Sequence, residues 1–179
     1  MKIYTKTGDR GDTRLFDGTR TRKDDQRVDA YGDVDELNSF IGAAAAWLDD
    51  NVLKAQLADI QRDLFSVGAT LANPKSATES NAKFHLDARR IEILEAAIDQ
   101  FETELPPLRQ FILAGGCPAG AFLHVARTVC RRAERRVVAL AVNVAVEEVV
   151  IRYLNRLSDY LFVLARLVNH RQGQQENPW

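Results

Sequence analysis

Apolar residues recur at steps of three and four along most of the chain beyond residue 25, the spacing of one face of an α-helix. In the last such run, Val150, Leu154 and Leu157 fall on one stripe. The second and third runs stop where Pro74 and Pro106 follow, because the residue before a proline disfavours the helical backbone. The pattern predicts five helices, over residues 28–48, 52–71, 87–105, 119–141 and 147–170.

The five predicted helices indicate an all-α fold. Short connections between them favour an antiparallel five-helix bundle within a single domain. The length of 179 residues is close to the usual size of one domain. Residues 1–24 form an extended N-terminal segment, residues 25–171 the bundle and residues 172–179 a short tail. Asp87 is the expected N-cap of the third helix, and the Ser-, Ala- and Asn-rich residues 75–83 are expected to form a mobile loop.

Composition agrees with a folded, water-soluble protein. Hydrophobic residues make up 46% of the chain, enough for a packed core. The net charge of −1 gives no reason to expect general attraction to nucleic acid or to an acidic membrane. The longest apolar stretches are too short and too rich in alanine to span a bilayer. The two cysteines, Cys117 and Cys130, form no CxxC motif and no signal peptide is evident, so a reduced cytoplasmic protein is expected.

The N-terminal segment combines glycines, hydroxyls and cations. Residues 5–14 read TKTGDRGDTR, and Arg20, Arg22 and Lys23 follow. Glycine lets backbone amides approach an anion closely, while Thr, Lys and Arg bind phosphate oxygens. The segment therefore predicts a polyphosphate site, although Gly8 does not begin a Walker A motif. A flexible, soluble arm is the alternative that composition leaves open.

The fourth predicted helix carries a charged face. His124, Arg127, Arg131, Glu134 and Arg135 follow at steps of three, four, three and one. Several arginines so close together require anionic partners, which Glu134, a carboxylate from another helix or chain, or a phosphate could supply. A solvated surface stripe is the alternative.

Polar residues also occur within the first and fifth predicted helices. Asp35 lies beside the apolar stripe of the first helix, where a buried carboxylate needs a partner such as Arg127. Favourable charge near the helix N-terminus is the alternative for Asp35. Asn155 and Ser158 lie in the middle of the fifth helix, which indicates either hydrogen-bonding tasks in a site or polar contacts between helices.

Several kinds of site are disfavoured. The chain has no Glu-x-x-His pair for a di-iron bundle and no Gly-x-Ser-x-Gly elbow. Its histidines, His85, His124 and His170, are too scattered to suggest zinc, so no resident metal site is predicted. No helix-turn-helix signature accompanies the arginines, so a nucleic-acid partner is not expected.

Five segments together carry a family resemblance, although no single one is specific. They are residues 5–11 (TKTGDRG), 27–39 (RVDAYGDVDELNS), 111–116 (FILAGG), 127–136 (RTVCRRAERR) and 153–162 (YLNRLSDYLF). In this order they resemble the PduO-type ATP:cob(I)alamin adenosyltransferases. The resemblance implies a ferritin-like five-helix bundle, a homotrimer with active sites between subunits, and transfer of the 5′-deoxyadenosyl group of ATP to cob(I)alamin with release of triphosphate.

The resemblance also implies roles for individual residues. It implies that Phe111 lies under the corrin ring and displaces the lower ligand of cobalt, that Asp35 and Arg127 form an ion pair between subunits, and that Arg131 acts in catalysis. It implies ATP contacts from one subunit through Thr5, Lys6, Thr7, Gly8, Thr13, Arg14 and Lys23. It implies further ATP contacts from the neighbouring subunit through Arg131, Arg132, Glu134, Arg135 and Asn155.

The implied chemistry fits the residues, because cobalt(I) is itself the nucleophile and no catalytic Ser, Cys or His is evident. Mg²⁺ bound to ATP is implied, as are a reductase that supplies reduced cobalamin and a cobalamin-dependent acceptor enzyme. A non-catalytic nucleotide or cobalamin sensor or chaperone is the alternative on the same bundle, and a purely structural helical oligomer is a third. The short tail leaves open what covers the corrin ring.

Overall fold

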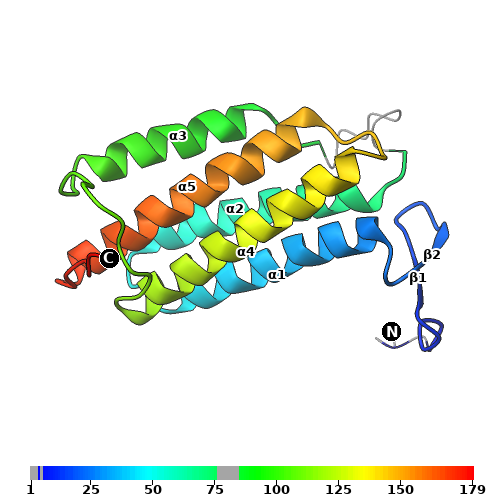
Figure 1. The fold of residues 1–179 in the computed structure, drawn as a ribbon, viewed down its shortest axis with the longest axis horizontal. Coiled ribbons are helices and arrows are strands. Elements are labelled where there is room, and N and C mark those ends of the chain that lie inside the picture. Colours follow the sequence, from blue (N-terminus) through cyan, green and yellow to red (C-terminus); the bar gives the residue numbers. More distant parts are fainter. Residues whose placement is uncertain (1–3, 5, 76–84) are drawn as a thin grey trace.

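The structure, a computed structural model, describes residue 4 and residues 6–75 and 85–179. These residues contain five helices and one small sheet (Figure 1). The elements are β1 (Asp12–Arg14), β2 (Arg20–Arg22), α1 (Gln26–Ala46), α2 (Asn51–Ala72), α3 (Arg89–Glu102), α4 (Pro118–Ala141) and α5 (Glu148–Arg171). The predicted five-helix bundle is confirmed. The expected loop at residues 75–83 lies outside the described residues except for Lys75.

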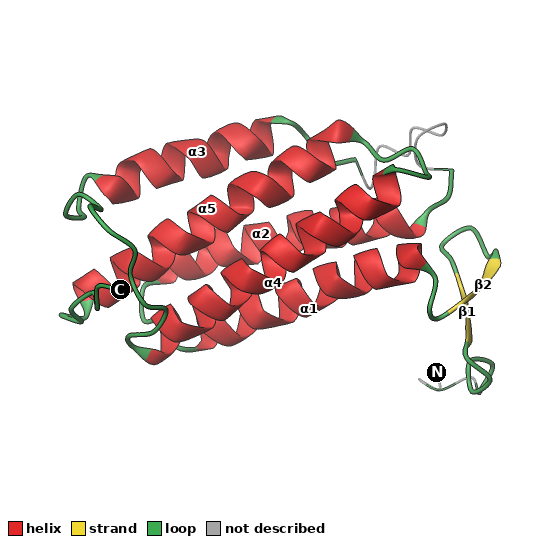
Figure 2. Ribbon diagram, viewed as in Figure 1, coloured by secondary structure: helices red, strands yellow, loops and turns green. Residues whose placement is uncertain are grey.

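The five helices lie side by side, and the short hairpin of β1 and β2 lies beyond one end of the bundle, next to the start of α1 (Figure 2). Helix α1 packs against α2 and α4, while α5 packs against α3 and α4. Tyr153 and Tyr160 of α5 are among the largest fully buried side chains. The predicted apolar face of α4 is buried, namely Ala126, Val129, Ala133, Val137 and Leu140. No helix in the described parts of the chain has the length and apolar character needed to cross a membrane.

The third helix is shorter than its sequence pattern predicts. It begins at Arg89 with Ala88 as its N-cap, one residue after the expected Asp87, whose carboxylate accepts a hydrogen bond from the Arg89 amide. Helix α3 ends at Glu102, because the following amides bond back by three residues into tight turns before Pro106. The predicted N-cap and C-terminal end of this helix were therefore wrong by one and three residues.

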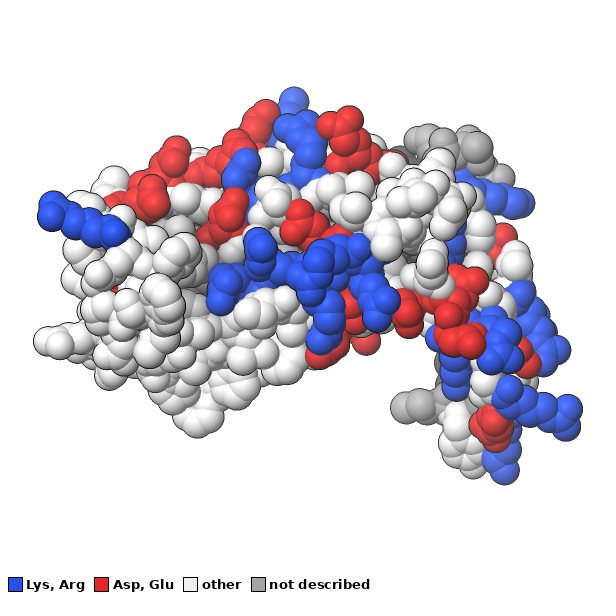
Figure 3. Space-filling model, in the orientation of Figure 1, with Lys and Arg blue, Asp and Glu red and all other residues white. Residues whose placement is uncertain are grey.

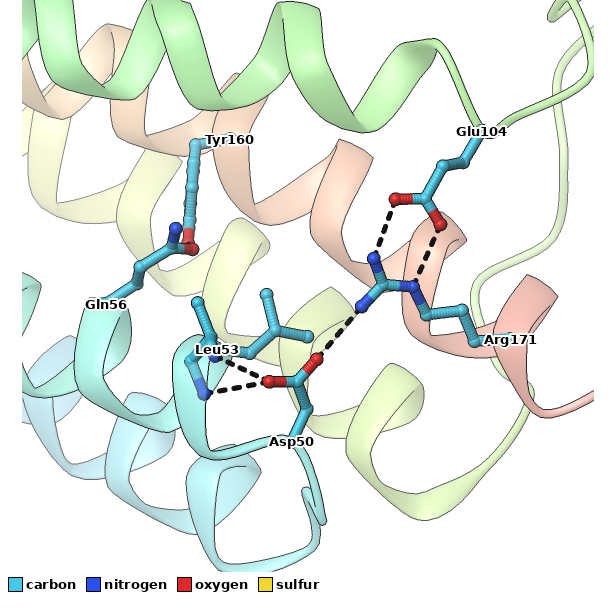
Figure 4. A network of polar contacts seen from close by, with 7 residues as sticks. Asp50, Leu53, Gln56, Glu104, Tyr160 and Arg171 are labelled. Atoms are coloured by element: carbon cyan, nitrogen blue, oxygen red, sulfur yellow. Dashed lines mark hydrogen bonds and ion pairs between the residues drawn. The ribbon is translucent and has the colours of Figure 1, made fainter.

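A polar network joins three helices at one end of the bundle (Figure 4). The Asp50 carboxylate caps α2 by accepting bonds from the amides of Val52 and Leu53. Arg171, at the end of α5, donates to Asp50 over 3.0 Å and to both oxygens of Glu104 over 2.7 and 3.0 Å. This guanidinium ties the start of α2 to the ends of α3 and α5.

A second polar cluster lies inside the bundle. The Tyr153 hydroxyl donates to Asp63 over 2.8 Å, and Arg90 Nε donates to the same carboxylate oxygen over 2.7 Å. Burial raises the pKa of Asp63, while the bonds from Arg90 and Tyr153 oppose that rise. Asp63 thereby links α2 to α3 and α5.

We expect Tyr153→Phe to lower the free energy of unfolding by about 1.5–3 kcal/mol, because a bond to a charged acceptor is lost. Tyr160→Phe is the matched control, since the Tyr160 hydroxyl donates to the neutral Gln56 side chain over 3.1 Å. That variant should lose about 1 kcal/mol. Urea denaturation measures both values, and an equal or smaller loss for Tyr153→Phe would contradict this assignment.

Candidate functional site

The hairpin and the residues before it form a cationic hollow. The strands pair antiparallel with Thr13 opposite Thr21, and the Lys23 amide bonds to the Gly11 carbonyl over 2.8 Å. A cavity of about 930 Å³ lies against this segment. Its lining residues are Lys6, Thr7, Gly8, Asp9, Arg10, Asp12, Thr13, Arg14, Arg20 and Lys23. We call this region the cradle.

The cradle is shaped for an anion. Five of its lining side chains are cationic and two are acidic, and one of the acids, Asp12, is already paired with Arg20 over 2.5 Å. A side chain at Gly8 would lie 3.0 Å from the Asp12 carbonyl and 3.4 Å from Lys23 Nζ, so only glycine leaves this approach open. The structure brings together the predicted residues Lys6, Thr7, Gly8, Thr13, Arg14 and Lys23, while Thr5 lies outside the described residues.

The end of α2 holds the cradle on the bundle. The Phe16 amide donates to the Ala72 carbonyl over 3.0 Å, and Arg27 donates to the Leu71 carbonyl over 2.6 Å. Arg27 is buried, and burial lowers its pKa. The free carbonyls at a helix C-terminus carry partial negative charge, which stabilises the guanidinium there.

A second polar region lies along α4 and α5. Asn155 Nδ2 donates to Glu134 over 2.9 Å, and Arg131 and Arg135 are exposed beside them. Figure 3 shows basic side chains gathered at two separate places on this face, around the hairpin and midway along the bundle. We call Arg131, Glu134, Arg135 and Asn155 the arginine face. Within one chain, the arginine face and the cradle form two distinct sites, because none of these four residues lines the cradle.

Arg132 lies apart from the arginine face. Its Nε donates to Asp33 over 3.2 Å and its Nη2 pairs with Glu36, both on α1 of the same chain. Arg136 also faces α1, 3.7 Å from Asp29 and 3.9 Å from Asp33. Carboxylates of α1 therefore supply anionic partners for two arginines of α4, and the structure does not bring Arg132 together with Arg131.

Asp35 and Arg127 do not meet within one chain. Among the residues that the structure describes, no ion pair joins them, so an ion pair between these two residues of the same chain is ruled out. Asp35 is exposed in a groove of about 400 Å³ between α1 and α2, beside Tyr31 and Phe65. Arg127 instead lies over the ring of Phe162 on α5.

Arg127 and His124 carry unpartnered buried atoms. Arg127 Nε and His124 Nδ1 are buried without a hydrogen-bond partner. Burial, and then the charge of Arg127, lower the pKa of His124 to about 4, so the imidazole is neutral at pH 7. A buried N–H without a hydrogen-bond acceptor costs stability. Arg127 is therefore a candidate to bind a group that its own chain does not provide.

Phe111 lies on the connection between α3 and α4 with its side chain 79% exposed. The segment after α5 runs beside it: the Trp179 amide donates to the Phe111 carbonyl over 2.9 Å, and the Leu113 amide donates to the Asn177 carbonyl over 2.8 Å. Sequence reasoning assigned no task to this tail. A signal was present in Arg166 and Asn169, polar residues on the otherwise apolar face of α5, which the structure places beneath the connection.

The described residues hold no group of three or more His, Cys, Asp or Glu side chains that could bind a metal ion. Cys117 and Cys130 are free and buried. Burial raises the pKa of the Cys130 thiol, which makes it a poor nucleophile. The cradle offers anion binding, and the exposed Phe111 ring offers apolar contact.

Known proteins resemble the chain over nearly its whole length. A corrinoid adenosyltransferase of Bacillus subtilis is 49% identical over 97% of this chain and 89% of its own. The PduO corrinoid adenosyltransferase of Salmonella typhimurium is 47% identical over 93% of this chain, which spans 49% of that protein. The human corrinoid adenosyltransferase MMAB is 46% identical over 98% of this chain and 72% of its own.

Solved structures share the fold. A phenylalanine-to-histidine variant of the PduO-type ATP:corrinoid adenosyltransferase of Lactobacillus reuteri, complexed with cobalamin and ATP, is 39% identical. It superposes with a TM-score of 0.93 and matches 99% of this chain and 96% of its own. The family described as cobalamin adenosyltransferase matches residues 3–168. The chain therefore belongs to the cobalamin adenosyltransferase family.

Proposed function

We propose that the protein transfers the 5′-deoxyadenosyl group of ATP to cob(I)alamin and releases triphosphate. The observation that carries the proposal is the cradle, a cationic hollow of about 930 Å³ in a member of this family. Relatives named corrinoid adenosyltransferases match nearly all of the chain, and similar solved structures hold ATP and cobalamin.

The reaction needs positioning and charge stabilisation more than protein nucleophiles. The cobalt(I) electron pair forms the bond to C5′, the C5′–oxygen bond breaks, and its electron pair leaves on triphosphate. Lys6, Arg14 and Lys23 of the cradle hold this developing charge, together with Mg²⁺ that arrives with ATP. Holding cobalt and C5′ in line contributes about 7–11 kcal/mol at best to lowering the barrier.

The complete site forms between subunits of a homotrimer. Separation of the cradle from the arginine face supports this arrangement, because Arg131, Glu134, Arg135 and Asn155 then approach ATP held by a neighbour. Arg132 contributes to the same nucleotide site from its position on α4, where it pairs with Asp33 and Glu36 of α1. Arg127, with its buried unpartnered Nε, pairs with the exposed carboxylate of Asp35 from an adjoining copy.

Phe111 forms the apolar wall under the corrin ring. Its ring is 79% exposed and therefore free to contact a ligand. An apolar ring at the lower face of cobalt offers no ligand atom and excludes water. Loss of the lower ligand makes cob(II)alamin easier to reduce to the reactive cob(I) state.

The cellular setting is also part of the proposal. The enzyme works in the cytoplasm, which two free buried cysteines support. It receives reduced cobalamin from a reductase and passes adenosylcobalamin to a cobalamin-dependent acceptor enzyme. It requires no nucleic acid and no membrane.

A spectral assay tests the activity. With ATP, Mg²⁺ and chemically reduced cobalamin, the cob(I)alamin absorption should give way to that of adenosylcobalamin. A non-catalytic sensor or chaperone would bind ATP and leave the spectrum unchanged. A structural oligomer would not bind ATP in calorimetry.

We expect Asp35→Asn to weaken trimer association, because each Arg127 would lose its counter-charge, a cost of about 1–3 kcal/mol per site. The KM for cobalamin should rise several-fold. Sedimentation over a dilution series measures assembly, and the exposed Asp99→Asn on α3 is the control. Unchanged assembly together with unchanged kinetics would refute the pairing.

A further inference from the structure

The segment after α5 forms a short antiparallel ladder with the connection that carries Phe111. Ile112 and Pro178 are bridge partners, with hydrogen bonds on either side of them. This register sets Phe111 directly opposite Trp179 on the outer face of the ladder. Figure 1 shows the C-terminal end of the chain beside the loop that leads into α4. Two stretches far apart in sequence thus meet at Phe111.

A buried ion pair anchors this ladder to the bundle. Arg166 of α5 is 3% exposed, and its Nε donates to Glu176 over 2.6 Å. Its Nη2 donates to the Pro106 carbonyl over 2.8 Å. One guanidinium therefore holds the segment after α5 and the beginning of the Phe111 connection. A buried arginine needs such partners, because an unpaired buried charge is costly.

Asn169, one turn further along α5, holds the other end of the connection. Its Nδ2 donates to the Gly115 carbonyl over 2.9 Å, and its Oδ1 accepts from the Cys117 amide over 3.0 Å. Gly116 has φ +103°, and a side chain there or at Gly120 would collide with the Asn169 amide. The connection is therefore fixed on both sides of Phe111 by polar groups of α5.

The position of Phe111 depends on this backbone. Its side chain is 79% exposed, so packing does little to fix it. The ladder includes the bond from the Trp179 amide to the Phe111 carbonyl. Glu176 is the side chain of the segment after α5 that binds Arg166. Loss of that ion pair should release the ladder while leaving the apolar core intact.

We propose that Glu176, acting through Arg166, is a positioning residue that holds Phe111 against the corrinoid. This inference rests on the proposed function, in which Phe111 contacts cobalamin. It assigns a task to a segment that lies outside the matched family region of residues 3–168. The segment around residue 176 thereby becomes part of the cobalamin site and not of the ATP site.

The test compares Glu176→Gln with the wild-type enzyme. We expect the KM for cobalamin to rise about tenfold, while the KM for ATP stays near the wild-type value. Because Arg166 loses its buried counter-charge, the thermal unfolding midpoint should also fall, so the kinetics are compared at a temperature where both proteins are folded. With ATP present, electron paramagnetic resonance of bound cob(II)alamin should show at least half of the lower-ligand-free signal lost. Glu95→Gln is the matched control, because it removes another Arg–Glu pair of α5, between Arg156 and Glu95 over 2.9 Å.

A double-mutant cycle with Phe111→Ala separates positioning from general destabilisation. If Glu176 acts through Phe111, adding Glu176→Gln to Phe111→Ala should change cobalamin kinetics less than twofold further. Independent, multiplicative effects would overturn the inference. So would a wild-type KM and spectrum for Glu176→Gln, or equal losses in Glu176→Gln and Glu95→Gln. Failure of the wild-type enzyme to adenosylate cobalamin would instead remove the proposed function itself.

Discussion

Arg131→Ala should lower the kcat of adenosyl transfer by about a hundredfold to a thousandfold, the usual cost of removing one donor that stabilises developing charge. Within the described part of the chain, Arg131 is exposed and has no ion-pair partner. Its charge is therefore available to triphosphate. Steady-state kinetics with saturating ATP and cob(I)alamin measure the loss.

Arg136→Ala provides the control from the same helix. Arg136 is also exposed, but it faces Asp29 and Asp33 of α1. Its removal should change kcat less than twofold. Near-normal turnover of Arg131→Ala, or equal losses in the two variants, would exclude Arg131 from the site.

Phe111→Ala should slow the reaction that starts from cob(II)alamin by about ten- to a hundredfold, while the KM for ATP changes less than twofold. The expected size follows from losing the burial of one large apolar side chain against the ligand, about 1.5–3 kcal/mol. The variant should also retain more of the lower ligand on bound cob(II)alamin, which its absorption and resonance spectra report.

Ile93→Ala is the matched control, because Ile93 is another exposed apolar side chain, 51% exposed on α3. Its kinetics should match those of the wild-type enzyme. Equal losses in ATP binding and in reaction from cob(II)alamin by Phe111→Ala would contradict its role at the corrin ring.

The sequence predicted the bundle well because burial of apolar stripes decides where helices form. The five predicted ranges agree with α1–α5 to within about three residues. The predicted bounds of the third helix were the least accurate. Its ends depend on local backbone turns around Ala88 and Thr103, and side-chain periodicity does not report these. The hairpin was missed because each strand has three residues, too few to show an alternating pattern.

The candidate site was predictable only in part. The glycine and cation pattern indicated the cradle directly, because these residues are close in sequence. Helical spacing left Arg132 off the charged face that holds Arg131, but it could not show which partners Arg132 meets. Adjacent helical residues point about 100° apart, and which side meets α1 depends on packing.

The environment of Phe111 could not be predicted from the sequence. It depends on Glu176 reaching Arg166, ten residues earlier in the chain, and on pairing between Ile112 and Pro178, which lie more than sixty residues apart. A single bridge of this kind has no periodic signature, because its register is fixed by tertiary contacts. The polar residues Arg166 and Asn169 on the apolar face of α5 were the only indication of these contacts in the sequence.

The shared site is tested most directly by mixing two inactive variants. Lys23→Ala damages the cradle and Arg131→Ala damages the arginine face, so each homotrimer should be nearly inactive. In co-assembled trimers from equal amounts, about a quarter of the interfaces join an intact cradle to an intact arginine face. A site shared between subunits predicts that adenosylcobalamin formation returns to about that fraction of the wild-type rate. A mixture no more active than its two components would contradict it.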